Sequence, residues 1–485
     1  MAVSVHSAPS KWVTLGIVAI GNYLSASELG VVVTFPTLIE IFESSPTSII
    51  WVQLVYMLVS ASIIFTMGNL ADRFGLGRVF TLGFLVFTTG LTLSSLAQGL
   101  GQLIACRAFQ SVGHAMLLSS EAALIMRAFP TSQQGRALGL RSAAGGLGLG
   151  SGPLLAGVLV QSLGWQSVFY LRIPLALLGF ILSWRFLRLS TPPQSPRGSL
   201  DILGALALFG SVSTFLLAVN QAGRAGWDSP VALIAASTAL FLFPLLIIVE
   251  RAASRPVLDL ALFRNRLFLL GQAALIFSFL AQGSVMYLTP FYFSGALGMT
   301  SLGIGVLLAT FSIIRLLVSP ISGLLSDRIG GRIPVTMGLL TLASGILVLS
   351  RQGAHGTLPL VVLGMVLAGF GSALFEPPNT RHIMDSLPRQ QWGTASASVA
   401  AGRQVSASTG TALIGTLFQI RESSHRTALA SAGLPPSLVD QQAIGLGFTD
   451  SLLLAMAFAL IGALIGGLRP SHRPGGPVDK DGPSS

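Results

Sequence analysis

The stretch Gly68-Asn69-Leu70-Ala71-Asp72-Arg73-Phe74-Gly75 returns later in the chain as Gly323-Leu324-Leu325-Ser326-Asp327-Arg328-Ile329-Gly330. Both copies lie between long apolar segments. A charged, glycine-rich turn between two membrane spans is unusual, and its recurrence in the second half of the chain predicts a duplicated helical bundle. Many membrane transporters are built from such repeats, with the substrate site between them near the midplane of the bilayer. This stretch therefore predicts both a fold and the location of a site.

The repeat extends beyond these two turns. Residues 113–130 (GHAMLLSSEAALIMRAFP) align without gaps with residues 371–388 (GSALFEPPNTRHIMDSLP), Gly135 matches Gly393, and Gly152 matches Gly410. Two apolar segments between the halves, 202–221 and 230–249, have no counterpart. We therefore expect four regions: an N-terminal six-helix bundle (1–200), an inserted two-helix segment (201–255), a C-terminal six-helix bundle (256–469), and a disordered cytoplasmic tail rich in Pro, Gly and Ser (470–485).

The composition is that of a multi-pass membrane protein. The chain is 52% hydrophobic and only 9% charged, whereas soluble proteins carry about 25% charged residues. Apolar runs long enough to cross a hydrocarbon core of ~30 Å recur along the sequence, and they are helices because lipid leaves no partner for open backbone groups. We expect an all-α fold of fourteen spans, at about 12–37, 47–69, 79–98, 101–124, 137–160, 167–187, 202–221, 230–249, 267–290, 302–325, 333–350, 357–377, 394–418 and 449–468.

The basic residues set the orientation and exclude several functions. The net charge is +11, but the arginines lie mainly in short loops on one side of the expected spans, which places both termini in the cytoplasm. We therefore expect no nucleic-acid partner. Lys11 and Lys480 are the only lysines and neither is placed for a phosphate-binding loop, while Cys106 is the only cysteine, so an intrachain disulfide or a cysteine metal cluster is ruled out.

At this point the sequence resembles the major facilitator superfamily over nearly its whole length. Gly68, Asp72, Arg73 and Gly75 match the signature that this family carries between helices 2 and 3, usually written GxLaDrxGrkxxl, and Arg78 falls in its basic stretch. The resemblance implies a major facilitator fold of two six-helix bundles. A charge network of this kind on the inner face can stabilise the state that is closed on that side and break when the other state forms. The alternative is that the network only connects two helices.

Two further motifs support the resemblance. Residues 103–113 (LIACRAFQSVG) are similar to the family's helix 4 motif LxxxRxxQGxG, which places Arg107 inside a span, where an arginine faces a cavity or an acid. Residues 148–157 (GLGSGPLLAG) resemble the helix 5 antiporter motif GxxxGPxxGG through Gly148, Gly152, Pro153 and Gly157. In the family this motif marks antiporters, so it favours export over uptake.

Other segments resemble the branch of fourteen-helix drug:proton antiporters. Residues 164–174 (GWQSVFYLRIP) look like its GWRWIFLINVP segment, with Arg172 in place of the usual asparagine. Residues 201–204 (DILG) look like its DxxG entry to the inserted pair, and Arg403-Gln404 resembles the RQ pair of helix 13. Helix 1 departs from the branch, because Ser27 stands where an aspartate is usual and Glu28 follows it.

The acids within the spans are candidates for coupling. An isolated buried acid either takes a proton or finds a partner, so Glu28 is a candidate proton-coupling or substrate-binding residue, with a structural ion pair as the alternative. Glu376 precedes Pro377 and Pro378, which open the helix; it is a second candidate, and either Arg403 or Arg381 is its expected partner.

Two further polar residues lie on the same expected helix as Arg107. Glu121 lies about 21 Å beyond Arg107 at 1.5 Å per residue, which places it near the inner surface by Arg127, Arg136 and Arg73. We therefore assign it to the inner charge network, which also contains Asp327 and Arg328. His114 lies on nearly the same face as Arg107 and is a candidate proton relay, although a lone helical histidine is more often simply hydrogen-bonded.

These features predict a proton-coupled antiporter that exports amphipathic or cationic drugs across the cytoplasmic (inner) membrane by alternating access. One alternative is export of an endogenous metabolite, siderophore or lipid by the same fold, and a second is a non-transporting membrane sensor. An enzyme is disfavoured because the chain has no catalytic motif such as G-x-S-x-G or H-E-x-x-H. We expect no catalytic residues, no cofactor and no metal; the expected partners are a small-molecule substrate, protons and the lipid bilayer, and the expected working form is a monomer.

Overall fold

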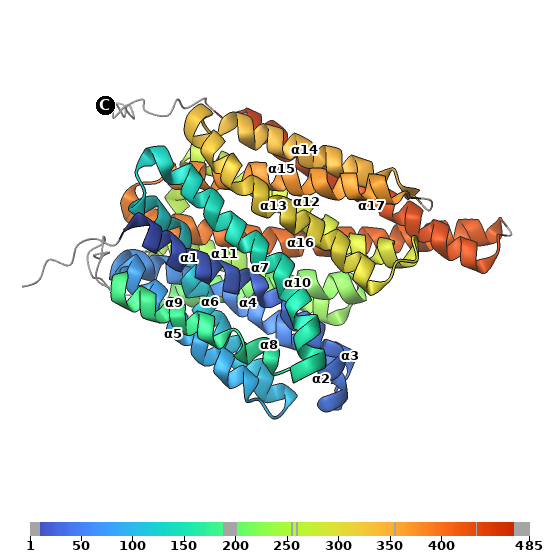
Figure 1. The fold of residues 1–485 in the computed structure, drawn as a ribbon, viewed down its shortest axis with the longest axis horizontal. Coiled ribbons are helices and arrows are strands. Elements are labelled where there is room, and N and C mark those ends of the chain that lie inside the picture. The colour runs from blue at the N-terminus through green and yellow to red at the C-terminus, as the bar shows by residue number, and fades with distance from the viewer. Residues whose placement is uncertain are drawn as a thin grey trace, which may run out of the picture.

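The computed structural model describes residues 10–187, 201–253, 256–258, 260–353, 356–432 and 434–469. Every regular element within these ranges is helical (Figure 1). The expected tail, 470–485, and residues 188–200, at the end of the expected first bundle, lie outside the described residues.

The first half of the chain contains the helices up to the inserted pair. They are α1 (Lys11–Ala26), the 3-10 helix η1 (Ser27–Thr34), α2 (Phe35–Ile41), α3 (Pro46–Ile49), α4 (Trp51–Phe74), α5 (Leu76–Ser95), α6 (Leu100–Ala128), η2 (Thr131–Gln133), α7 (Gln134–Leu163), α8 (Ser167–Tyr170) and α9 (Ile173–Phe186).

The inserted pair and the second half follow. Their elements are α10 (Ile202–Ala225), α11 (Pro230–Ala252), η3 (Leu260–Arg264), α12 (Arg266–Gly295), α13 (Ser301–Ile329), α14 (Arg332–Ser350), α15 (Leu358–Asp385), η5 (Arg389–Gln391), α16 (Trp392–Ser431) and α17 (Pro436–Gly467). At the right of Figure 1, the end of α16 and the start of α17 project beyond the other helices as a hairpin.

Twelve helical segments of the described chain are long and apolar enough to cross a membrane. They coincide with twelve of the fourteen expected spans. The other two expected spans, 101–124 and 394–418, are helices α6 and α16, which do not meet that measure of hydropathy. Both pack against several other long helices, so their polar residues face protein rather than lipid, where such residues are tolerated. The fourteen-span count stays a prediction.

The two halves meet through glycines at one end of the bundle. A Cβ added to Gly323 would lie 2.1 Å from the backbone oxygen of Gly135, and one added to Gly68 would lie 2.6 Å from the Cβ of Ala397. Such distances leave no room for any side chain, so these glycines permit the close approach of α13 to α7 and of α4 to α16.

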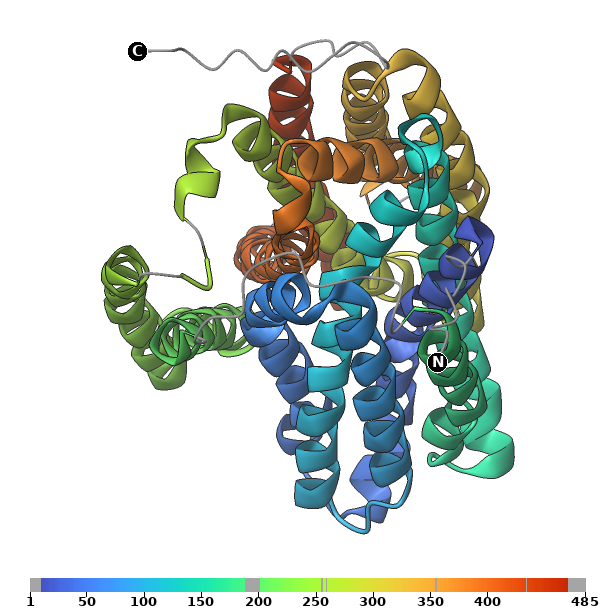
Figure 2. The same cartoon turned by 90° about the vertical axis from the view of Figure 1, so that its left-hand side faces the viewer.

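The inserted pair lies beside the bundle. Helices α10 and α11 pack against each other, and α10 also contacts α4 of the first half and α16 of the second. Figure 2 shows the two helices as a pair at one side of the molecule. Through α10, the inserted pair therefore contacts both halves.

The first and last described helices begin and end at the same end of the molecule. The Nζ of Lys11 donates to the Oε1 of Gln133 at 2.6 Å, and the Nη2 of Arg469 donates to the Oδ1 of Asn379 at 2.5 Å. Gln133 lies two residues before Gly135 and Asn379 two residues before Arg381, and both Gly135 and Arg381 contact Asp327. Helix α1 therefore starts, and α17 ends, on the side where this repeated aspartate lies. That this side is cytoplasmic stays a prediction.

Cysteine labelling tests the orientation. In a Cys106→Ser background, Ala225→Cys lies at the exposed end of α10, beside the turn to α11, and Ser132→Cys lies in the exposed turn between α6 and α7. A membrane-impermeant maleimide added to intact cells should label only Ala225→Cys, because the positive-inside bias places the two turns on opposite sides. Labelling of Ser132→Cys alone would reverse the orientation, and labelling of both would contradict the fourteen-span topology.

Candidate functional site

The first spanning segment changes its helical type where its acid lies. Helix α1 gives way to η1 at Ser27, and Glu28 is the second residue of this 3-10 segment. Runs of 3-10 helix longer than three or four residues are uncommon and often mark a functional hinge. The change was not foreseen from the sequence, which predicts one continuous span.

The glycines of the helix 5 motif hold this segment against α7. A Cβ on Gly148 would lie 2.5 Å from the backbone oxygen of Tyr23, and one on Gly152 would lie 2.8 Å from that of Ser27. Pro153 lies inside α7, while a Cβ on Gly157 would meet nothing within 4 Å. Two motif positions therefore touch the backbone that carries Glu28, and Gly157 does not.

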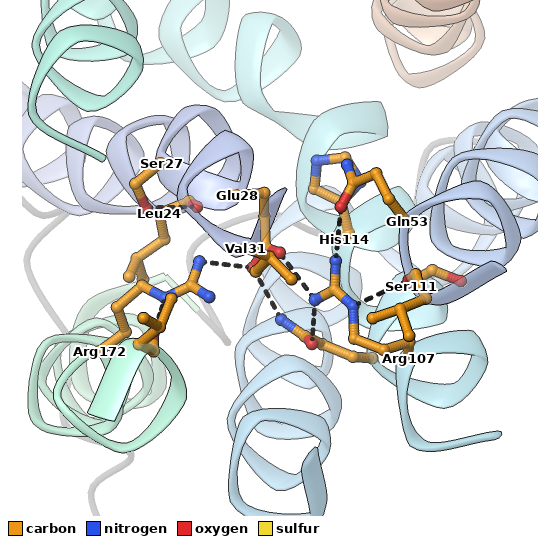
Figure 3. Close-up of polar contacts among 12 residues, drawn as sticks. Leu24, Ser27, Glu28, Val31, Gln53, Arg107, Ser111, His114 and Arg172 are labelled. Carbon is orange, nitrogen blue, oxygen red and sulfur yellow. Dashed lines mark hydrogen bonds and ion pairs between the residues drawn. The ribbon is translucent and has the colours of Figure 1, made fainter. Parts of the chain in front are cut away.

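Glu28 is clamped between two arginines (Figure 3). One carboxylate oxygen lies 2.7 Å from Nη1 of Arg107, and the other lies 2.7 Å from Nη1 of Arg172. The Nε2 of Gln110 donates a further hydrogen bond to Glu28 at 2.8 Å. Because Glu28 is only 3% exposed, these charged partners offset the cost of removing its carboxylate from water.

Arg107 is fully buried and connects three helices. Its guanidinium donates to Oε1 of Gln110 at 2.6 Å and, at 3.3 Å, to the backbone oxygen of Val52 and to Oε1 of Gln53. It also lies 4.1 Å from the centre of the Tyr56 ring, within the range of a cation–π contact.

His114 does not join the carboxylate cluster directly. Its Nδ1 lies 2.9 Å from the Oγ of Ser60, and its ring centre lies 4.9 Å from that of Tyr56. His114 is therefore hydrogen-bonded, as the alternative interpretation expected. Its role as a proton relay stays a prediction.

The second half contains a matching clamp. Glu376 on α15 pairs with Arg315 on α13 and with Arg403 on α16, whose Nη1 lies 2.8 Å from the carboxylate. Of the two expected partners, the structure brings Arg403 to Glu376, whereas Arg381 pairs with Asp327. Each half thus holds one buried acid between two arginines.

Glu121 forms a third buried pair. One of its oxygens accepts hydrogen bonds from Nη2 and Nε of Arg141, at 2.6 and 2.8 Å, and from Nδ2 of Asn22 at 2.8 Å. The structure therefore places Glu121 against Arg141 of α7 and Asn22 of α1. Its expected part in the conformational switch stays a prediction.

A cavity of about 330 Å³ lies between the two halves. Both clamped acids line it, one from each half, and its volume is within the range of small-molecule sites. Its polar and charged lining includes Asn22, Glu28, Gln53, Tyr56, His114, Arg141, Arg315, Glu376, Arg403 and Gln404. Within the described ranges, no group of three or more His, Cys, Asp or Glu side chains is placed to hold a metal ion.

The repeated aspartates join the halves at the end where α1 starts. Asp72 of α4 accepts hydrogen bonds from the backbone N–H groups of Gly393 and Thr394 at 2.7 and 2.9 Å, and from the Thr394 hydroxyl at 2.9 Å. These amides are at the start of α16, where the helix dipole favours a negative charge.

Asp327 makes the equivalent contact in the opposite direction. Its carboxylate accepts from the backbone N–H groups of Gly135 and Arg136, at the start of α7, at 2.9 and 2.8 Å. Arg381 donates to it at 2.5 Å. We call these two cross-half contacts the aspartate latches.

The other residues of the repeated turns have different surroundings. Gly75 has a φ of 101°, which a side chain rarely adopts, and it allows the sharp turn between α4 and α5. Arg73 is buried, Arg78 is half-buried and Arg328 is exposed.

Sequence reasoning missed three of the arginines that pair with the buried acids. Arg172 was visible only as a departure from the usual asparagine of its segment, and Arg141 only as one of the arginines that set the orientation. Arg315 was visible within a span, but nothing in the sequence identified its acid.

Known proteins resemble this chain along most of its length. The model of the Major Facilitator Superfamily matches residues 14–280 and 273–422. The riboflavin transporter RibZ of Clostridioides difficile is 31% identical over 84% of this chain and 88% of that protein. The multidrug resistance protein Stp of Mycobacterium tuberculosis H37Rv is 31% identical over 84% of this chain and 74% of that protein.

Two other similar proteins add to this comparison. The tetracenomycin C resistance and export protein of Streptomyces glaucescens is 27% identical over 84% of this chain and 76% of that protein. Among solved structures, the human organic anion transporter MFSD10 (TETRAN) superimposes with a TM-score of 0.64 over 93% of this chain and 100% of that one. At 16% identity, this last likeness concerns the fold alone.

Proposed function

The chain belongs to the Major Facilitator Superfamily, and from that premise we propose that it exports amphipathic small molecules across the cytoplasmic membrane by alternating access, in exchange for protons. The observation that carries the proposal is the cavity between the halves, which is lined by a clamped acid from each half. The helix 5 motif, whose glycines touch the segment bearing Glu28, favours the antiporter type within this superfamily.

In this proposal residues 1–200 and 256–469 form the two rocking bundles, and 201–255 form the inserted pair of the fourteen-helix drug:proton antiporter branch. The aspartate latches hold the cytoplasmic side closed and release when the cavity opens inward. The relatives that are named as multidrug resistance and export proteins support the proposal that this chain is an exporter.

Glu28 and Glu376 are the proposed proton acceptors. Each lies in the cavity and is held by two arginines. A proton on either carboxylate weakens its pairing with both arginines and changes the charge of the cavity by one unit. Because protonation changes both the charge and the contacts of the cavity, it can shift the equilibrium between the inward-open and outward-open states.

Export of an endogenous metabolite is the second candidate function. The observation that favours it is the likeness to a protein named as a riboflavin transporter. Both candidates use the same fold and the same cavity, and in both the chain works as a monomer. A non-transporting sensor is the remaining alternative.

Reconstitution in liposomes tests the export proposal. With an imposed pH gradient, the purified protein should move fluorescent amphipathic probes, and Glu28→Gln or Glu376→Gln should lower the gradient-dependent flux by about tenfold or more, because a charged hydrogen-bonded pair is lost. Glu40→Gln, which changes an exposed acid on α2, is the matched control. Equal flux with and without the gradient, in folded protein, would contradict proton exchange.

A further inference from the structure

We infer that the substrate of the central cavity is an organic anion with an apolar body. This inference rests on the proposed transport function and assigns the charge of what is transported. The observation behind it is the imbalance of buried charge at and around the cavity.

Positive side chains outnumber negative ones in this cluster. Its three carboxylates belong to Glu28, Glu121 and Glu376, and its five guanidiniums belong to Arg107, Arg141, Arg172, Arg315 and Arg403. Two positive charges are therefore left over when every acid is ionised. Unbalanced charge away from water is costly, and a bound anion offsets part of that cost, whereas a bound cation adds to it.

The two acids that line the cavity, Glu28 and Glu376, offer little to a cation. Each oxygen of Glu28 already contacts an arginine, and so does each oxygen of Glu376. A cationic substrate would have to displace an arginine from one of these pairs and leave that arginine without its partner. Removing one partner from a buried ion pair is strongly destabilising, because the other charge stays buried without a partner.

The arginines, by contrast, retain capacity to bind. The side chains of Arg315 and Arg403 are 13% and 19% exposed, and both line the cavity. The Nε of each is buried without a hydrogen-bond partner among the described residues. Two planar guanidiniums that share one carboxylate between them have donors left for a carboxylate, sulfonate or phosphate group of a ligand.

The rest of the lining suits an apolar body. Leu29, Leu118 and Leu149 line the cavity, as does Phe279, whose ring centre lies 5.9 Å from the Arg403 guanidinium. An aromatic anion therefore fits with its charged group at Arg315 and Arg403 and its ring against these apolar side chains.

Outward movement of an anion is also favoured electrically. A cell membrane that is negative inside drives anions out, so export of an anion in exchange for an incoming proton is driven by both the potential and the pH gradient. The inferred charge therefore agrees with the proposed direction of transport.

Two probes of one shape and opposite charge separate the cases. Naphthalene-2-sulfonate and trimethyl-2-naphthylammonium share a ring system, and their charges do not change with pH. In liposomes the wild-type protein should carry the sulfonate about tenfold faster or more, because only the sulfonate pairs with the free guanidinium donors. An inside-negative potential set with valinomycin should increase sulfonate efflux from vesicles in which the protein keeps its cellular orientation.

Variants then locate the contact. Arg403→Gln and Arg315→Gln should reduce sulfonate flux about tenfold, and Arg403→Lys should retain more of it than Arg403→Gln. Gln404→Glu adds a negative charge to the lining without removing a clamp, so it should weaken sulfonate binding even if the arginine variants fold poorly. Arg264→Gln, at an exposed position near the start of α12, is the control and should leave flux unchanged.

The outcomes distinguish this inference from the proposed function. Flux of the ammonium probe but not of the sulfonate would overturn the anion assignment and leave export in place. Sulfonate flux that is unchanged in all three charge-altering variants, Arg403→Gln, Arg315→Gln and Gln404→Glu, would overturn the assigned site. Flux of neither probe through folded protein would count against both the anion inference and the proposed transport.

Discussion

Replacing Arg107 by alanine should lower the free energy of unfolding by about 3–5 kcal/mol, the usual cost of leaving one member of a buried ion pair behind. Arg107 is fully buried, and it is one of the two arginines on Glu28. The change also removes its contacts with Gln110, Gln53 and the Tyr56 ring. Titration of the purified protein with a denaturing detergent, followed by helical circular dichroism, measures the loss.

Two further variants separate charge from packing. Arg107→Lys keeps the charge but not the fork of donors that reaches Glu28, Gln110 and Gln53 at once, so it should recover only part of the stability. Arg185→Ala, at an exposed position near the end of α9, should change the free energy by less than about 0.5 kcal/mol. A loss at Arg107 no larger than that at Arg185 would mean that the Glu28 cluster does not stabilise the fold.

Asp72→Asn should open the first aspartate latch and reduce transport about tenfold or more while the protein stays folded. The carboxylate accepts three hydrogen bonds from Gly393 and Thr394, and its negative charge interacts favourably with the start of α16. An asparagine keeps one acceptor oxygen and loses the charge, so the closed arrangement becomes less favourable relative to the open one.

Accessibility measures this opening directly. Ala397 is fully buried against Gly68 at the latch, so Ala397→Cys in a Cys106→Ser background should react slowly with a maleimide. Adding Asp72→Asn should speed that reaction, whereas Asp228→Asn, in the exposed turn before α11, should not. Equal labelling rates in the two double variants would show that Asp72 does not hold this end closed.

The sequence was sufficient to predict the features that follow from hydrophobic runs and repeated motifs. Long apolar runs require helices in lipid. The recurrence of one turn sequence around Asp72 and Asp327 indicates that the chain contains two related halves. The intramembrane position of Arg107 predicted a buried contact, because an arginine in a span needs an acid or a cavity.

Other features depend on packing that a single sequence does not encode locally. Arg172 and Arg315 reach their acids across helices far apart in the chain, and no spacing rule pairs them. The 3-10 segment that carries Glu28 packs against Gly148 and Gly152 of α7, a contact with a different helix that the local sequence does not encode. Packing also explains why α6 and α16 are more polar than the other long helices, since helices surrounded by protein need not be as apolar as helices that face lipid.

The two aspartate latches have a consequence for the origin of the molecule. Asp72 binds the start of α16 at Gly393, and Asp327 binds the start of α7 at Gly135. Since the repeat equates Asp72 with Asp327 and Gly135 with Gly393, the two contacts are one interaction made twice about a pseudo-two-fold axis. Such an isologous interface closes on itself when two identical subunits meet. A half-length chain with one aspartate and one glycine would therefore have formed both latches as a homodimer, before any fusion of the two copies.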